Sequence, residues 1–367
     1  MMLRRLLPFA FIGAATTLPA QSIVDLGARV APQFHSYTIK DPTNIKISEF
    51  SVPLFVLVPI TPSFSFDVGT AWAKSQVDQT GGGKTTTSTI SGLTDTQVRA
   101  NYVLGNDFVV LTAGVNIPTG KSTVPVSEQV AAGLIGSDFL AFPIGSMGTG
   151  LGGTGGVAIA QPLGDWNFGV GFSMRHSAQY DPFDAAGGPA LHYQPGNEYR
   201  GRVGLDRGVG TGRFTVGLTY STFGNDNLAG SIYKTGTRYL SQMSYNDTYG
   251  PGQVSLIGWD LFRASGKLAD GTTVGNENIL NGALAYGITS GSVLIEPNVE
   301  ARGWMQTDAS TSALGTVGLR LQFPMGGLTV VPSAGYSIGK LASQTAAGVS
   351  TTADLTGFHA TLAIRLR

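Results

Sequence analysis

Residues 166–174 read WNFGVGFSM, a strict alternation between one bulky apolar side chain and one small or polar side chain. The bulky side chains take the even positions, and asparagine, glycine and serine take the odd ones. A period of two indicates a β-strand, because successive side chains of a strand point to opposite faces. The same pattern recurs in VVLTAGVNI at 109–117, FTVGLTY at 214–220 and FHATLAIRL at 358–366, so strands extend along the chain.

The side chains opposite the bulky ones distinguish a membrane barrel from a soluble β-sandwich. They are mostly glycine, serine, threonine, asparagine and arginine, whereas a strand face in water is rich in lysine and glutamate. Charged residues make up 13% of the chain, against about a quarter in soluble domains. No apolar run reaches the ~18 residues that a membrane-spanning helix needs. We therefore predict an all-β fold, an antiparallel transmembrane β-barrel.

The expected connections alternate in length, as in outer-membrane barrels with short periplasmic turns and long external loops. Tight turns are expected at 105–107, 163–165, 208–212, 290–291 and 324–327, and long connections near 76–93, 119–153, 177–197, 224–234, 265–277, 304–312 and 341–356. The expected strands are 23–38, 45–58, 63–76, 94–104, 108–118, 153–163, 166–177, 198–208, 212–223, 234–247, 252–264, 278–289, 292–304, 312–323, 327–340 and 356–367. Omitting the weak strand 234–247 and one other would leave about 14 instead of 16, and both numbers are even, as the barrel requires.

The N-terminus has the layout of a secretory signal peptide. Arg4 and Arg5 precede the apolar stretch at 6–15, and LPA at 18–20 offers a small residue at the cleavage position. The expected organisation is a signal peptide at 1–20 followed by a β-barrel at 21–367, which we expect in the outer membrane of a bacterium. A formal net charge of zero gives no reason to expect a nucleic-acid partner.

With the bulky face turned to lipid, the charged side chains of the strands are expected inside the barrel. An arginine or lysine facing lipid at mid-membrane would cost about 2–4 kcal/mol. The expected lumen charges are Asp25, Arg29, Asp67, Arg99, Arg175, Arg200, Arg202, Asp206, Asp260, Glu296, Glu300, Arg302, Arg320 and Arg365. Most would form ion pairs between neighbouring strands, since buried charges are usually paired. The alternative is a charged constriction, for which Glu296, Glu300 and Arg302 are the best candidates.

Aromatic residues near the expected strand ends suit the two membrane–water interfaces, where their amphipathic rings are favoured. Ordinary half-buried strand aromatics are the alternative. The residues concerned are Trp72, Tyr102, Trp166, Tyr220, Trp259, Trp304 and Tyr336.

The sequence contains no complete enzyme motif. We therefore expect that the protein has no enzymatic activity, no cofactor and no metal site. GGGKT at 81–85 resembles the end of a phosphate loop, but the required first glycine is replaced by Asp78. There is no Gly-x-Ser-x-Gly elbow, and the histidines lack metal-ligand spacing. A hydrolytic site on the external rim is the less favoured alternative, with His176, His192, Asp181 and Asp184 in or near one loop.

The long connection at 119–153 contains an apolar stretch with a rough helical pattern, VSEQVAAGLIGSDFLAF at 126–142. Long loops are usually functional or disordered, and an apolar loop at the barrel end should fold over or into its mouth. There it would bind a hydrophobic ligand or act as a plug, and we predict Leu134, Ile135, Phe139 and Phe142 as the binding residues. An equally favoured alternative is that the loop packs on its neighbours and only caps the barrel.

Several motifs occur in a family-like order. GLTD at 92–95 leads into VRANY at 98–102, NIPTG follows at 116–120, and GTGLGGTGG at 148–156 precedes YQPGNE at 193–198. Over roughly 90–225 this order resembles outer-membrane transporters related to the long-chain fatty-acid transporter, and relatives found beside aromatic-degradation pathways. The resemblance implies uptake of hydrophobic small molecules. Those transporters carry an N-terminal plug, whereas the strand pattern here begins at Ile23, which makes 126–142 the expected obstruction.

The leading hypothesis is therefore an outer-membrane channel or transporter for passive uptake of small hydrophobic molecules. The alternatives are a structural or adhesive barrel with a filled lumen, and a general porin. The expected partners are membrane lipids and small hydrophobic ligands, and a monomer is favoured because no strong subunit interface is marked.

Overall fold

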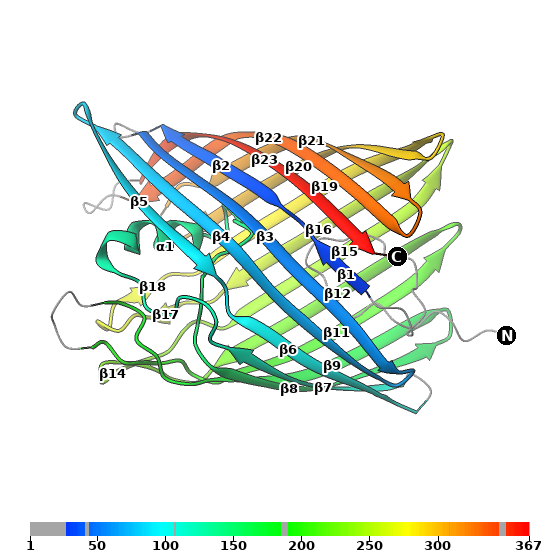
Figure 1. Ribbon diagram of the computed structural model, residues 1–367, viewed down its shortest axis with the longest axis horizontal. Helices are drawn as coiled ribbons and strands as arrows, with labels where there is room; N and C mark the ends of the chain where they lie inside the picture. The colour runs from blue at the N-terminus through cyan, green and yellow to red at the C-terminus, as the bar shows by residue number, and fades with distance from the viewer. Residues whose placement is uncertain are drawn as a thin grey trace.

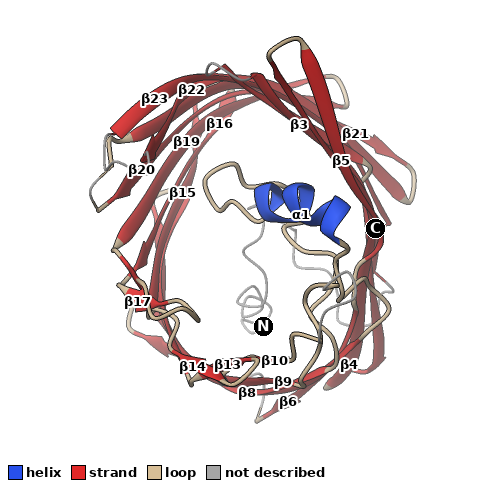
Figure 2. Ribbon diagram, turned by 90° about the vertical axis from the view of Figure 1, so that its left-hand side faces the viewer, coloured by secondary structure: helices blue, strands red, loops and turns tan. Residues whose placement is uncertain are grey.

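A computed structural model describes residues 27–40, 44–105, 108–184, 190–307, 309–344 and 350–366. They form one closed antiparallel β-barrel of 16 strands, seen from the side in Figure 1 and end-on in Figure 2. The first strand consists of β1 (Gly27–Val30) and β2 (Gln33–Lys40), and the fourth of β5 (Lys84–Leu93) and β6 (Thr96–Leu104). The expected signal peptide at 1–20, Ile23 and Asp25 lie outside the described residues.

The remaining barrel strands follow in chain order around the wall. They are β3 (Asn44–Thr61), β4 (Phe64–Gly81), β7 (Val109–Ile117), β8 (Gly152–Leu163), β9 (Trp166–Ser177), β11 (Glu198–Val209), β12 (Gly212–Phe223), β15 (Arg238–Tyr249), β16 (Gly252–Arg263), β19 (Glu277–Ser290), β20 (Val293–Gln306), β21 (Ser312–Met325), β22 (Leu328–Gln344) and β23 (Ser350–Leu366). The barrel closes because Arg29 of β1 pairs with Phe55 of β3 on one side and with Arg365 of β23 on the other.

The elements outside the wall are short. A 3-10 turn at Val126–Glu128 leads into helix α1 (Gln129–Ile135), and the external loops carry β10 (Tyr193–Gln194), β13 (Asp226–Leu228), β14 (Ser231–Tyr233), β17 (Gly266–Lys267) and β18 (Thr273–Val274). Within the described residues, neither α1 nor any other helix has the length and apolarity to cross a membrane.

Tight turns join strands at the end of the barrel where β1 begins and β23 ends. Five of them are two residues long and start with a glycine at positive φ, between 58° and 62° (Gly164, Gly210, Gly250, Gly291 and Gly326). Positive φ at the first turn residue only is the type II′ arrangement, whose twist matches that of the flanking strands. The sequence predicted four of these turns, and Gly250-Pro251 is the additional one.

Two expected long connections are mostly strand. Residues 76–93 form the β4–β5 hairpin around Gly82 and Gly83, both at positive φ, and most of 341–356 belongs to β22 and β23. Their alternation continues because the inner faces of these strands still pack against apolar side chains beyond the membrane band. The weak strand predicted at 234–247 is present as β15, which gives 16 strands and not 14.

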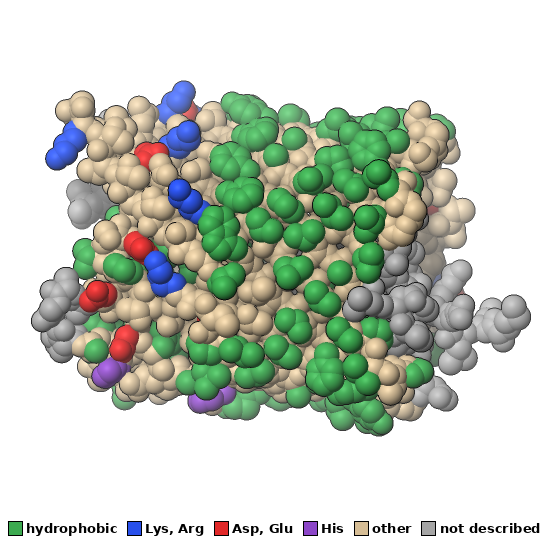
Figure 3. Space-filling model, in the orientation of Figure 1, with side chains coloured by type: hydrophobic (Ala, Val, Ile, Leu, Met, Phe, Trp, Pro, Cys, Tyr) green, Lys and Arg blue, Asp and Glu red, His purple; other side chains and the backbone are tan. Residues whose placement is uncertain are grey.

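The outer surface has the polarity of a membrane protein. Figure 3 shows hydrophobic side chains over a broad band of the wall, with lysine, arginine and acidic side chains gathered toward the end that carries α1 and β5. Phe172, Leu280 and Val317 are more than half exposed on this surface. Because the cost of a charge on the lipid face is high, such a band marks the part of the wall that spans the bilayer.

Two sequence predictions about side-chain direction are wrong. Asp260 was expected inside, but it lies on the outward face of β16, opposite Ser241 of β15. Trp259 and Trp304 were expected in the interfacial girdles, but both pack inside the barrel against the apolar core. In β16 both faces carry bulky apolar residues, so the alternation does not reveal which face is inward. Asp260 is level with the lipid-exposed Leu280, and its neighbour Trp259 with the buried Asn281.

Candidate functional site

Residues 118–151, called here the lumen segment, enter the barrel between β7 and β8. Figure 2 shows α1 inside the ring of strands, displaced toward one side of it. The lumen segment buries the apolar residues Ala131, Ile135, Phe139, Leu140, Phe142 and Met147. They pack against apolar residues of the wall, which are Tyr37, Ile39, Ile47, Ala73, Val77, Ile90, Ile279, Leu314, Ala353 and Leu355. The inner wall is therefore apolar on this side of the external mouth because the lumen segment covers it.

Phe139 is the centre of this packing. Its side chain is 0% exposed, and its ring stacks on Trp304 at a centroid distance of 5.5 Å. Arg302 Nη1 donates a hydrogen bond of 2.7 Å to the Phe139 carbonyl, and Phe142 meets Tyr37 edge-on at 5.5 Å. Phe139 and Phe142 thus hold the lumen segment to the wall.

The four predicted binding residues have different surroundings. Ile135, Phe139 and Phe142 are buried in the packing just described, at 1%, 0% and 7% exposure. Leu134 is half-buried and lines a cavity of about 400 Å³ between the lumen segment and the wall, together with Ile39, Trp304 and Leu341. Any contact of these residues with a ligand stays a prediction, and Leu134 has the position that best suits it.

Asp95 fastens both ends of the lumen segment. It lies at the junction of β5 and β6, where its carboxylate accepts hydrogen bonds from Asn116 Nδ2 at 2.8 Å and from Gly120 N at 3.1 Å. It also accepts one from Thr149 N at 2.6 Å. At Gly120 a side chain is impossible without a shift, since a Cβ would lie 2.1 Å from the Met147 carbonyl oxygen. The motifs GLTD, NIPTG and GTGLGGTGG therefore meet at one structural junction.

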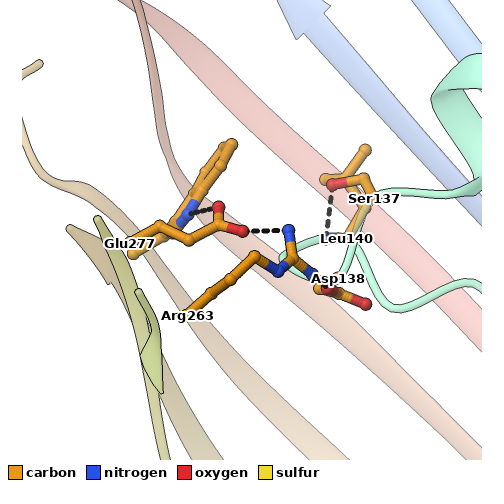
Figure 4. Close-up of polar contacts among 6 residues, drawn as sticks. Ser137, Asp138, Leu140, Arg263 and Glu277 are labelled. Carbon is orange, nitrogen blue, oxygen red and sulfur yellow. Dashed lines mark hydrogen bonds and ion pairs between the residues drawn. The ribbon is translucent and has the colours of Figure 1, made fainter. Parts of the chain in front are cut away.

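Two further polar contacts hold the middle of the lumen segment. Glu49 of β3 is 1% exposed, and it accepts hydrogen bonds from Ile144 N at 2.9 Å and from Ser75 Oγ at 3.0 Å. Arg263 of β16 bridges Asp138 of the lumen segment, at 2.6 Å, and Glu277 of β19 (Figure 4). Sequence reasoning missed Glu49, and it placed neither Asp95 nor Arg263 in a site.

The wall across the lumen from this packing is built from small residues. In β7, β8 and β9 the bulky side chains point to lipid, as the exposed Leu111, Val157 and Phe172 demonstrate. Their inward positions hold Thr112, Gly114, Asn116, Thr154, Gly156, Ala158, Gly169, Gly171 and Ser173. Val110, Asn167 and Arg175 are the larger inward residues of these strands, and Arg175 contacts Thr149 at the end of the lumen segment. Most inward side chains of β7–β9 are therefore short and occupy little of the lumen.

Of the fourteen strand charges expected in the lumen, Asp25 lies outside the described residues, Asp260 is outward, and the register of the strands puts the other twelve on the inward face. Three ion pairs join Arg200 to Glu198 at 2.7 Å, Arg302 to Glu300 at 2.6 Å and Arg320 to Glu296 at 2.6 Å. Arg99 pairs with Asp67 at 2.7 Å, and Arg175 and Arg202 donate to Thr149 and Thr219 at 3.1 Å each. Arg365 is half-buried near the short-turn end. Ion pairing between or along strands therefore accounts for most of this set.

The external loops are joined through Asp226. Its carboxylate, 4% exposed, accepts hydrogen bonds from Tyr193 Oη at 3.1 Å, Gly196 N at 2.8 Å and Thr235 Oγ1 at 2.6 Å. Burial, together with the nearby Asp226 charge, raises the pKa of Tyr193, so its hydroxyl remains a donor. These bonds tie residues 193–196 to residues 226–235.

The predicted rim residues do not converge on one centre. His192 Nδ1 lies 2.6 Å from Asp181, whereas His176 Nδ1 contacts Asn197 at 2.7 Å. Among the described residues, no three histidine or acidic side chains are grouped so that they could hold a metal ion.

No protein-family model matches this chain, and no characterised protein matches it in sequence. Its fold is similar to solved outer-membrane barrels. OmpT of Vibrio cholerae is 9% identical, with 93% of this chain and 96% of that chain covered and a TM-score of 0.45. An outer membrane channel from Pseudomonas putida F1 is 12% identical, with 97% of this chain and 98% of that chain covered and a TM-score of 0.40. A FadL homologue from Pseudomonas aeruginosa is 10% identical, with 93% of this chain and 90% of that chain covered and a TM-score of 0.43. Similarity at this level assigns no function, and the resemblance to fatty-acid transporters stays a prediction.

Proposed function

We propose that this protein is a passive channel of the bacterial outer membrane, with an external mouth narrowed by the lumen segment. The apolar outer band supports the membrane location. Barrels of about 16 strands are wide enough to leave an aqueous channel. The observation that carries the proposal is the arc of mostly short inward residues on β7–β9, such as Gly114, Gly156 and Gly171, which faces the lumen opposite the packed α1.

Ion conductance of residues 21–367 refolded into planar bilayers tests this function. A passive channel gives steady conductance steps that scale with salt concentration. A structural or adhesive barrel with a filled lumen gives none, even after the lumen segment is deleted. Folding is checked independently by the shift in gel mobility between heated and unheated barrel, so that a silent barrel is distinguished from an unfolded chain.

Uptake of small hydrophobic molecules is the more specific candidate. It is favoured by the cavity of about 400 Å³ beside Leu134, which is lined by Ile39, Trp304 and Leu341. A cavity of this volume and lining suits one small apolar molecule, since ligand sites span about 300–1,000 Å³ and are mostly apolar. The cavity lies where the lumen segment meets the wall, so a molecule entering from outside would meet it early.

Leu134→Asp tests that candidate, because a carboxylate in the cavity opposes an apolar solute. Val130→Asp is the matched control, since Val130 is on the same helix but 44% exposed and does not line the cavity. Uptake of toluene into liposomes should fall with Leu134→Asp and stay unchanged with Val130→Asp. Equal uptake by both variants would contradict hydrophobic transport through this cavity while leaving the channel function intact.

A further inference from the structure

The charges of the described inner wall do not balance. Toward the short-turn end, each acid there is held by one arginine: Asp67 by Arg99, Asp206 by Arg213 and Glu296 by Arg320. Arg29 and Arg365 remain at the same end. Neither has an acidic partner among the described residues.

These two arginines face each other directly. Arg29 of β1 and Arg365 of β23 are register partners at the seam where the barrel closes. Both side chains are half-buried, and within the described part of the chain Arg365 Nε is buried without a hydrogen-bond partner. Like charges directly opposite each other destabilise a strand pair, so this arrangement is unfavourable without a counter-charge.

An oxyanion would relieve the repulsion. A guanidinium presents a planar fork of N–H donors that matches the two oxygens of a carboxylate or phosphate, and such bonds are among the strongest that side chains form. Two forks on adjacent strands could hold one oxyanion from both sides.

We propose that Arg29 and Arg365 form a binding site for a small oxyanion, a carboxylate or a phosphate, at the short-turn end of the lumen. This inference rests on the proposed channel function, to which it adds the solute class: the channel favours anions, and the arginine pair binds them at the exit. Higher in the wall, Arg175 and Arg238 form no ion pair with any acid of the described residues, and they add to the positive potential along the route.

Isothermal titration of the folded barrel with sodium benzoate, and separately with inorganic phosphate, tests the site without relying on conductance. The double variant Arg29→Gln/Arg365→Gln should bind at least about tenfold more weakly than the native barrel, the loss expected for one charge-assisted hydrogen bond or more. Arg365→Lys keeps the charge but loses the fork, and should bind with intermediate affinity. Binding of benzoate alone would assign the site to carboxylates, and binding of phosphate alone to phosphates.

Arg202→Gln is the control for net charge, because it removes one positive charge from the inner wall away from the seam. It should keep the native affinity. Equal affinity in the double variant and the native barrel, equal loss in Arg202→Gln, or no binding of either anion by the native barrel would overturn the site.

Reversal potentials in a potassium chloride gradient separate this inference from the channel function. A native barrel selective for chloride, with selectivity reduced in the double variant, supports both. A barrel that conducts without preferring anions contradicts the inference alone. A barrel that binds benzoate or phosphate but does not conduct contradicts the channel function alone.

Discussion

Replacing Phe139 by alanine should release the lumen segment without unfolding the barrel. Phe139 is completely buried, and its ring contacts Trp304, which belongs to the wall. It takes no part in the strand-to-strand hydrogen bonds. The loss of its ring therefore weakens the attachment of the lumen segment and leaves the closure of the sheet unchanged.

Truncating a buried phenylalanine to alanine costs about 3–5 kcal/mol. At 1.4 kcal/mol per factor of ten, the ratio of attached to detached segment falls by roughly two to three and a half orders of magnitude. The hydrogen bond from the Arg302 side chain is accepted by the backbone carbonyl of residue 139, so the substitution keeps it and the segment detaches only intermittently.

Single-channel recording measures this effect. Phe139→Ala should show a larger mean conductance and frequent transitions between two levels, at the same yield of folded barrel. Phe172→Ala is the matched control, because Phe172 is 54% exposed on the lipid face and does not touch the lumen segment. Native conductance and native noise in Phe139→Ala would refute the role of this residue as the attachment point.

Three other substitutions test separate parts of the structure. Asp95→Ala removes the acceptor of the hydrogen bonds from Asn116, Gly120 and Thr149, and a hydrogen bond to a charged group is worth about 1.5–3 kcal/mol. The variant should speed amide exchange at 118–120 and 147–151, measured by mass spectrometry, and native exchange there would contradict the fastening role of Asp95. Asp226→Ala should increase protease cleavage within 224–237, and an unchanged cleavage pattern would exclude it as the link between the loops. Gly291→Ala places a side chain at a φ of 60°, which should lower the free energy of unfolding by about 1–2 kcal/mol. The midpoint of unfolding in urea should therefore fall, and a native midpoint would argue against a strained turn.

The strands and the turns could be read from the sequence because the membrane imposes a simple rule. Lipid outside selects bulky apolar residues at every second position, and two-residue turns need glycine at positive φ, as at Gly164 and Gly326. Both signals are local, so they remain visible before the chain is folded.

Beyond the membrane band this rule no longer sorts side chains, and the predictions fail there. Trp259 turns inward because the lumen segment offers an apolar surface, and Asp260 is consequently directed outward. The strands of the β4–β5 hairpin continue because Val77 and Ile90 pack on that segment. The pattern of 76–93 contains glycines and threonines that also suit a loop, so the sequence did not distinguish the two.

The polar attachments of the candidate site depend on distant residues. Glu49 and Ile144 are 95 positions apart in the chain, and only the folded barrel brings them together. In the sequence, the contact is indicated only by a glutamate that stands in a largely apolar strand. In contrast, the motifs around Asp95 and Gly120 were visible in the sequence, although the reason for them, a shared junction, was not.

The central claim is that the lumen is a passage which one segment narrows. Comparing the conductance of the native barrel with that of a variant whose residues 121–147 are replaced by a short glycine–serine linker tests it most directly. The account predicts steady conductance in the native barrel and a several-fold larger value in the variant. Two folded barrels that are both silent would contradict a passage, and equal conductance in the two would contradict the narrowing.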